Sequence, residues 1–216
     1  MIALASLLAV GAAEFWGGSI VGYRWQIRRD PPPPRLTASL PTMSDLLDTG
    51  SEHAVKWTGE PRIAHYDPWA RHIVLSRQWT SVWDVVSAHV VAHERCHADQ
   101  PRWPVRLAGM HMVWAVLWGV GAGWGQMVFP GAFASGVVAQ WILDGVFRRR
   151  LEYDADQGAV MRVTQGMADP DRAAVIRWGR QLARNHQRAL MIDGVGLSGL
   201  TLIVAVVTYQ IGLWVR

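Results

Sequence analysis

Two histidines with a glutamate between them form the most chemically suggestive pattern in this chain of 216 residues. His93 and His97 lie four positions apart, with Glu94 beside the first, in the stretch VVAHERCHADQ. Side chains four apart on a helix point the same way, so both imidazoles can bind one metal ion. Glu94 is then placed to accept a proton from water rather than to bind the ion. The alternative is a polar helix face with two ordinary histidines, but the preceding VVSAHVVA is apolar and favours a functional reason for the charge.

A useful histidine pair needs a third ligand, because a catalytic zinc ion takes three protein ligands and keeps one open position. The stretch RRRLEYDADQGAV, residues 148–160, offers Glu152 and Asp156, again four apart. We expect Glu152 to be the third ligand and Asp156 to accept a hydrogen bond from the second nitrogen of a ligand imidazole. His89, one turn before His93, is expected to support the ligands or belong to the core rather than to bind the ion.

The two stretches are separated by a long apolar segment, which indicates a membrane. Half of the residues are hydrophobic, thirteen are tryptophan, and residues 107–143 contain no acidic, lysine or arginine side chain. This segment is too long for one span and suits two, with Pro130 and Gly131 at the turn. Small residues between Gly119 and Gly125 allow close helix packing. The predicted spans are residues 1–21, 107–128, 132–147 and 194–215, with a cleaved signal peptide as the alternative for the first.

These spans predict the organisation of the whole chain. We expect a transmembrane helix in residues 1–25, a cytoplasmic segment in 26–106, a transmembrane hairpin in 107–147, cytoplasmic helices in 148–188 and a last transmembrane helix in 189–216. Arginines cluster at the span ends beside the two polar segments, and such residues favour the cytoplasmic side. The metal site is therefore expected on the cytoplasmic face of the inner (plasma) membrane, in a multi-pass protein. Because the basic residues sit at span ends, nucleic acid is not an expected partner.

The local patterns of the polar segments complete the predicted fold. Residues 30–35, DPPPPR, favour an extended linker, and residues 42–57 predict a short helix. Residues 61–76 predict two strands around a turn at Asp67 and Pro68, and residues 79–100 predict a helix that Pro101 ends. The expected fold class is mainly α: an integral membrane protein with about four transmembrane helices, a zincin-like H-E-x-x-H helix and a small β-hairpin.

Longer stretches around the histidine pair carry a family resemblance. AHYDPWARHIVLS, residues 64–76, followed by VVAHERCHADQ, resembles the neutral zinc metallopeptidases of bacterial membranes, the YugP type. EYDADQGA, residues 152–159, is similar to the E-x-x-A-D segment of HtpX-type membrane peptidases. The similarity runs from about residue 49 to 160 and implies Zn²⁺ as cofactor, peptide hydrolysis and a cytoplasmic catalytic face. The chain departs from the YugP pattern at Ala64, where that family has Asp, and from both families at Cys96, where they have Gly.

The leading functional expectation is an integral membrane zinc-dependent endopeptidase with Glu94 as the general base. His65 and Tyr66 are candidates for substrate binding, and their strand can pair with an extended peptide. The expected partners are a peptide or membrane-protein substrate and the lipid bilayer, and no sequence feature indicates an oligomeric state.

Two other functional classes follow from particular residues. A catalytically inactive zinc-binding membrane scaffold is favoured by Cys96, which could crowd its helix against a neighbour where glycine would not. A metal transporter would need ligands inside the spans, where the chain offers Glu14, His111 and Asp144. Cys96 points away from the shared histidine side and is expected to be a packing residue. A single thiol cannot form an internal disulfide.

Overall fold

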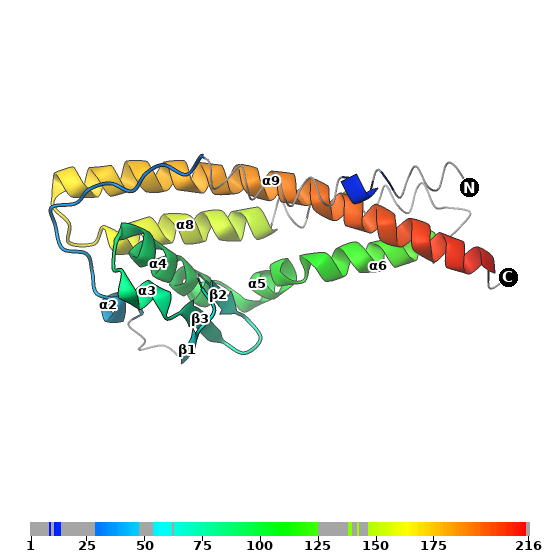
Figure 1. The fold of residues 1–216 in the computed structure, drawn as a ribbon, viewed down its shortest axis with the longest axis horizontal. Helices are drawn as coiled ribbons and strands as arrows, with labels where there is room; N and C mark the ends of the chain where they lie inside the picture. The colour runs from blue at the N-terminus through cyan, green and yellow to red at the C-terminus, as the bar shows by residue number, and fades with distance from the viewer. Residues whose placement is uncertain are drawn as a thin grey trace. The chain divides into compact units, whose positions relative to one another are not determined.

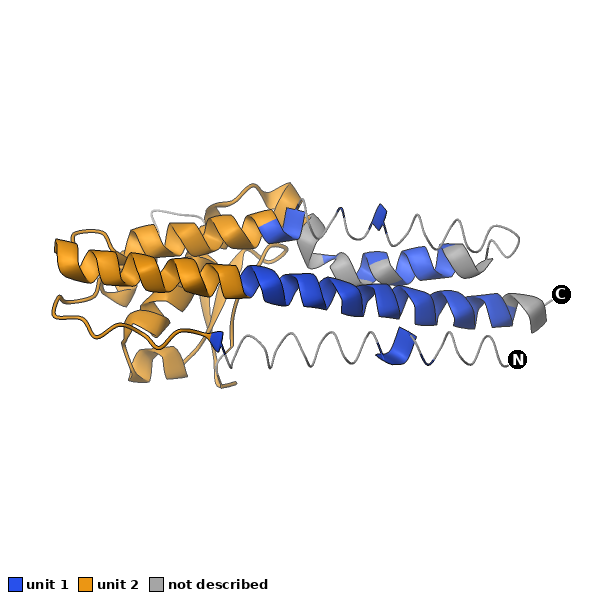
Figure 2. Cartoon of the chain, turned by 90° about the horizontal axis from the view of Figure 1, so that it is seen from above, with its two compact units in different colours: residues 1–29, 107–149, 186–216 blue, residues 30–106, 150–185 orange. Residues whose placement is uncertain are grey.

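The protein is mainly helical, with one small sheet (Figure 1). The computed structural model describes residues 9, 11–13, 29–47, 54–61, 63–124, 138–139, 142 and 147–214. The chain forms two compact units (Figure 2). Unit 1 comprises residues 1–29, 107–149 and 186–216, and unit 2 comprises residues 30–106 and 150–185. The residues with predicted chemistry, His89 to His97 and Glu152 to Asp156, all belong to unit 2.

The sheet of unit 2 has three strands in the order β1-β3-β2. β2 (Ala64–Asp67) and β3 (His72–Ser76) are antiparallel, which confirms the predicted pair of strands around the turn. The Asp67 carboxylate fixes that turn by accepting hydrogen bonds from the backbone N–H groups of Trp69 (2.8 Å) and Ala70 (3.0 Å). β1 (Ala54–Thr58) pairs in parallel with β3. The helix predicted for residues 42–57 is present as α2 (Met43–Leu47) and is wrong for residues 54–57, which belong to the strand β1.

The helix predicted for residues 79–100 is divided into α3 (Gln78–Ser81) and α4 (Val85–Asp99). Asp84 causes the division, because its carboxylate caps α4 by accepting from the N–H of Ser87 at 2.8 Å. α4 ends at Gln100, whose extended backbone leads into Pro101, as predicted. The core of unit 2 forms where α4 packs on the sheet, with Ile73, Leu75 and Val91 fully buried.

α8 (Arg149–Val163) lies alongside the first part of α9 (Asp169–Trp214) in Figure 1. The two helices approach closely at Gly179, where a Cβ atom would meet the Val160 side chain. The extended linker at residues 30–35 is also tied to α9, since the indole of Trp178 donates to the carbonyl of Pro31 (3.0 Å). Just beyond the linker, Asp171 of α9 accepts from the backbone N–H groups of Thr37 and Ala38.

Unit 1 contains α6 (His111–Trp124) and the apolar part of α9. The helix predicted for residues 107–128 is interrupted at Met110, because α5 (Arg102–Gly109) ends just before it. Gly119 makes the close helix contact that its small size permits, since a Cβ there would lie 2.8 Å from the carbonyl oxygen of Thr201 on α9. Elsewhere on α6, the side chains of Val113, Val116, Leu117 and Val120 are exposed.

Among the described residues, one helix is long and apolar enough to cross a membrane, namely residues 169–211 of α9. The predicted boundary between cytoplasmic helices and a last span at residue 189 falls within α9, which continues through it without a break. Most of the predicted span 1–21, the turn at Pro130 and Gly131 and most of residues 132–147 lie outside the described residues, as do Glu14 and Asp144.

Candidate metal centre

Three potential metal ligands from two helices converge in unit 2. His93 Nε2 and His97 Nε2 of α4 lie 3.0 Å apart, and Glu152 Oε2 of α8 lies 3.3 Å from each of them. A tetrahedral zinc site with ligand distances of about 2.0–2.2 Å places its ligand atoms about 3.3 Å from one another. The three atoms therefore have the mutual spacing that such an ion requires.

The other nitrogen of each imidazole is fixed by an acceptor. His93 Nδ1 lies 2.9 Å from Asp156 Oδ1, and His97 Nδ1 lies 2.8 Å from Gln100 Oε1. A carboxylate and an amide oxygen only accept hydrogen bonds, so both Nδ1 atoms carry the proton. In the neutral imidazoles, both Nε2 lone pairs then face each other and a carboxylate oxygen. A cation among these three acceptors would offset their mutual repulsion, so these residues fit a bound metal ion.

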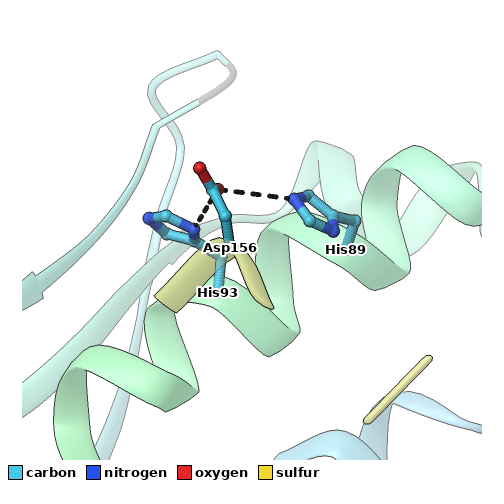
Figure 3. A group of neighbouring side chains, drawn as sticks. All are labelled: His89, His93 and Asp156. Atoms are coloured by element: carbon cyan, nitrogen blue, oxygen red, sulfur yellow. Dashed lines mark ion pairs between the residues drawn. The ribbon is translucent and has the colours of Figure 1, made fainter. Parts of the chain in front are cut away.

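A second group, His89, His93 and Asp156, also brings potential ligand atoms close together (Figure 3). Its His93–Asp156 contact at 2.9 Å is a direct hydrogen bond, whereas His89 Nε2 is 3.7 Å from the same carboxylate oxygen. The hydrogen bond from His93 Nδ1 to Asp156 orients the ring so that Nε2 can bind an ion together with His97 and Glu152. We therefore assign Asp156 and His89 to positioning His93 and not to binding an ion themselves. His89 also contacts the ring of Trp178 edge-on, with centroids 5.3 Å apart, which fixes it from α9.

Charges within the cluster shift the pKa values of its members in opposite directions. Burial acts to lower the pKa of His93, but hydrogen bonds to Asp156 and Glu152 raise it well above its usual value. His97 responds in the same way, with Glu152 outweighing burial and raising its pKa. Burial acts to raise the pKa of Glu152, and the two histidines nevertheless hold it well below the usual range. Without a metal ion, a proton on the imidazoles takes the place of the cation.

Zinc binding should therefore become tighter as the pH rises through neutrality. Zinc must displace a proton from each protonated imidazole that it binds. Below the raised pKa of that imidazole, the affinity for zinc therefore falls about tenfold for each pH unit. In the metal-free protein, the raised pKa of His93 stabilises the fold below that pKa, and this stabilisation is lost as the pH rises. The increase in melting temperature on adding zinc should accordingly grow with pH. Chelator competition and thermal unfolding across the neutral range measure both effects, and a pH-independent affinity would contradict the arrangement.

Glu94 lies beside the ligands in a buried position. Its side chain is 9% exposed, and burial raises its pKa, although the neighbouring charges of His93 and His97 act to lower it. Its carboxylate also accepts a hydrogen bond from the backbone of Tyr66 on β2. A buried carboxyl with a raised pKa, held next to a metal centre, is suited to accept and return a proton.

The register of β2 explains why its backbone reaches Glu94. Ser76 N–H donates to the carbonyl of Ile63 (2.7 Å), so Ile63 and Ser76 form a hydrogen-bonded pair of the antiparallel ladder. Hydrogen-bonded and non-hydrogen-bonded pairs alternate along such a ladder. The backbone N–H and C=O groups of Ala64 and Tyr66 therefore point away from β3. β2 is an edge strand, and this outward edge faces the site. Of the two predicted substrate-binding residues, His65 is exposed, whereas the side chain of Tyr66 is buried in the core. Tyr66 therefore reaches the site through its backbone and not through its phenol.

Gln100 also belongs to this cluster, although the sequence suggested no role for it. Its Oε1 holds His97, while its Nε2 donates to the carbonyl of Leu151 (2.7 Å), the residue before Glu152. The second bond determines which end of the amide faces His97. Gln100 thus selects the His97 tautomer and joins the ends of α4 and α8 that carry the ligands. The spacing His97-x-x-Gln100, one helical turn, was the available signal.

Replacing Gln100 with leucine should weaken zinc binding by about 10- to 100-fold, the usual cost of losing a partner that orients a metal ligand. Gln100→Glu supplies the control, because it keeps an acceptor for His97 Nδ1 but loses the donor to Leu151. We expect Gln100→Glu to retain more of the affinity than Gln100→Leu in chelator competition. Equal losses in both variants would show that the bond to Leu151, and not the histidine tautomer, matters.

Cys96 packs against α8 at a position that has no side chain. A Cβ atom at Gly158 would lie 2.6 Å from Cys96 Sγ, so the glycine makes room for the thiol. Burial raises the pKa of Cys96, which disfavours the reactive thiolate. The expected crowding by Cys96 is therefore wrong, because the neighbouring helix accommodates it.

Gly158→Ala should destabilise the protein by about 1–3 kcal/mol, as expected for an added methyl group in a well-packed contact. The double variant Cys96→Gly with Gly158→Ala removes the collision and should recover most of that loss. Thermal unfolding of the unsubstituted protein, the two single variants and the double variant measures the coupling. If the double variant is no more stable than Gly158→Ala alone, the two positions are not complementary.

Asp154 lies apart from these ligands. Its side chain is 57% exposed and approaches Arg150 at 3.9 Å on the same helix.

No protein-family model, curated protein or solved structure matches this chain.

Proposed function

We propose that this protein is an integral membrane zinc-dependent endopeptidase, in which His93, His97 and Glu152 hold the ion. The observation that carries the proposal is the convergence of these three ligand atoms at 3.0–3.3 Å beside the buried Glu94. Zinc in such a site supplies a Lewis acid that activates water and polarises a carbonyl group. The same motif and the third acidic ligand underlie the resemblance to membrane zinc metallopeptidases.

Each residue around the ion then has a distinct role. Glu94 accepts the proton of the attacking water and passes it to the leaving amine, which its raised pKa favours. Asp156 and Gln100 orient the two imidazoles, and His89 supports Asp156 from behind. A substrate in extended form can pair with the outward backbone groups of β2 next to Glu94, so recognition depends little on substrate side chains.

The apolar helices support the proposed membrane location. α6 exposes a face of valine and leucine side chains, and residues 169–211 form a helix of sufficient length and apolarity to span a bilayer. We propose that they belong to a multi-pass protein of the inner membrane with about four spans. The arginines next to the apolar segments favour a cytoplasmic site, where the substrate is a peptide or a membrane protein.

The two alternative functions receive less support. The inactive scaffold was favoured by crowding at Cys96, and Gly158 accommodates that thiol. The transporter would carry its ligands in apolar segments, whereas His93, His97 and Glu152 lie on α4 and α8 in unit 2.

The test is metal removal and restoration on the purified full-length protein in detergent or nanodiscs. We expect one zinc ion per chain and cleavage of an unfolded protein substrate such as casein. A chelator should abolish cleavage and added zinc should restore it. Bound zinc without any cleavage would favour the scaffold, and a protein that binds no zinc would end the proposal.

A further inference from the structure

Two large aromatic side chains are exposed on unit 2 beside three arginines. Trp69, in the turn between β2 and β3, is 56% exposed, and Trp103, in the first turn of α5, is 67% exposed. The guanidinium of Arg106 stacks over the Trp69 ring at 4.7 Å from its centroid. Arg71, in the same turn as Trp69, and Arg102, next to Trp103 at the start of α5, complete what we call the Trp–Arg patch.

The patch is held in a fixed conformation. Besides the hydrogen bonds that Asp67 accepts from the turn, Arg106 Nε donates to the carbonyl of Pro68 at 3.2 Å. Arg71 adopts a left-handed backbone conformation, φ 59°, that closes the turn towards β3. The two indoles therefore leave apolar area in contact with water on a surface of fixed conformation.

The position of the patch in the chain indicates the partner. α5 leads within a few residues into α6, whose exposed face is apolar. Tryptophan and arginine next to an apolar helix are typical of the membrane–water interface, where indoles lie at the level of the headgroups. Basic residues at this level are attracted by anionic lipids. An acidic peptide would also complement the three arginines, but it would not account for the two indoles or for the apolar helix that follows.

We infer that the Trp–Arg patch of unit 2 rests on the anionic headgroup surface of the bilayer. Together with the proposed peptidase activity, on which this step depends, the contact defines a substrate class. Trp69 follows Tyr66 by three residues, which span at most about 11 Å, and the Tyr66 backbone contacts Glu94. The site then lies close to the membrane surface, and its substrates are extended segments of membrane proteins where they emerge from the bilayer.

The docking is tested on the full-length protein in nanodiscs, without reference to cleavage. An environment-sensitive fluorophore is attached to Trp69→Cys or Trp103→Cys in a Cys96→Ala background, with Trp57→Cys on β1 as the matched control. Trp57 is also an exposed tryptophan of unit 2, at 38%. Brominated lipids should quench the labels at 69 and 103 but not at 57. Quenching should be stronger with phosphatidylglycerol than with phosphatidylcholine alone. Thermal unfolding reports that each variant is folded.

The arginines are tested by substitution with glutamine at positions 71, 102 and 106. Each neutralised charge should reduce about fivefold the equilibrium constant for docking of the patch on the lipid surface, read from the quenching of the labels. Equal quenching at 69 and 57 would overturn the inference. Protection of the label by polyglutamate but not by anionic lipid would likewise overturn it, in favour of an acidic peptide partner.

A cleavage measurement then separates the two proposals. The triple arginine variant should still cleave a soluble peptide but lose its preference for a peptide anchored in the same nanodisc. If quenching occurs and no peptide of either kind is cleaved, the docking stands and the peptidase proposal fails. If both peptides are cleaved equally well by the unsubstituted protein, the membrane-surface substrate class is wrong.

Discussion

Glu152→Ala should remove zinc from the protein while leaving unit 2 folded. The two imidazoles of α4 alone do not complete the three-ligand set that catalytic zinc requires. Loss of an orienting partner costs about 10- to 100-fold in affinity, so loss of a ligand should exceed about 100-fold. The Glu152 side chain is 24% exposed, so its truncation leaves no sealed cavity in the core. Chelator competition gives the affinity, and elemental analysis of the purified protein gives the metal content.

Asp154→Ala is the matched control for this result. Asp154 lies on the same helix, two residues further on, and its side chain is exposed to solvent. We expect this variant to keep its zinc and its melting temperature. If Glu152→Ala retains tightly bound zinc, the ion is held by another set of residues and the proposed centre is wrong.

Glu94→Gln should separate metal binding from catalysis. The glutamine amide oxygen can still accept the hydrogen bond from the Tyr66 backbone, so the contact between α4 and β2 is kept. It cannot accept a proton from water, and the loss of a general base lowers turnover by about 10²- to 10⁴-fold. We therefore expect unchanged zinc content with cleavage reduced by at least about 100-fold, measured on a fluorogenic peptide.

Two outcomes would assign Glu94 differently. If zinc is lost together with activity, Glu94 contributes to holding the ion or its ligands. If cleavage continues at the original rate, another group accepts the proton. A parallel Glu60→Gln variant, in the exposed stretch after β1, controls for a simple loss of negative charge.

The parts of the site that follow from helical periodicity could be predicted from the sequence. The i to i+4 spacing of His93 and His97, and of Glu152 and Asp156, predicts one shared face on each helix. The structure brings these two faces together. Because Glu152 and Asp156 are offset by one turn, they meet the Nε2 and Nδ1 sides of the same imidazole, which explains their different roles.

Features that depend on contacts between distant segments could not be predicted in this way. β1 has weak alternation and exists through its parallel pairing with β3, which no local pattern reveals. The role of Gln100 depends on the docking of α8, since its amide is oriented by the carbonyl of Leu151. Tyr66 was expected near the substrate, but strand alternation turns its phenol into the core. The break before α4 did have a local signal, the Asp84-x-x-Ser87 cap.

The attachment of the proline-rich linker to α9 affects how this protein can be truncated for expression. A stretch such as DPPPPR ordinarily serves as a dispensable boundary at which a soluble fragment can start. Here Pro31 accepts from Trp178, and the ring of Trp178 contacts His89, one helical turn before His93. A fragment intended to retain metal should therefore begin at or before Asp30, and a fusion tag or protease site belongs upstream of that residue.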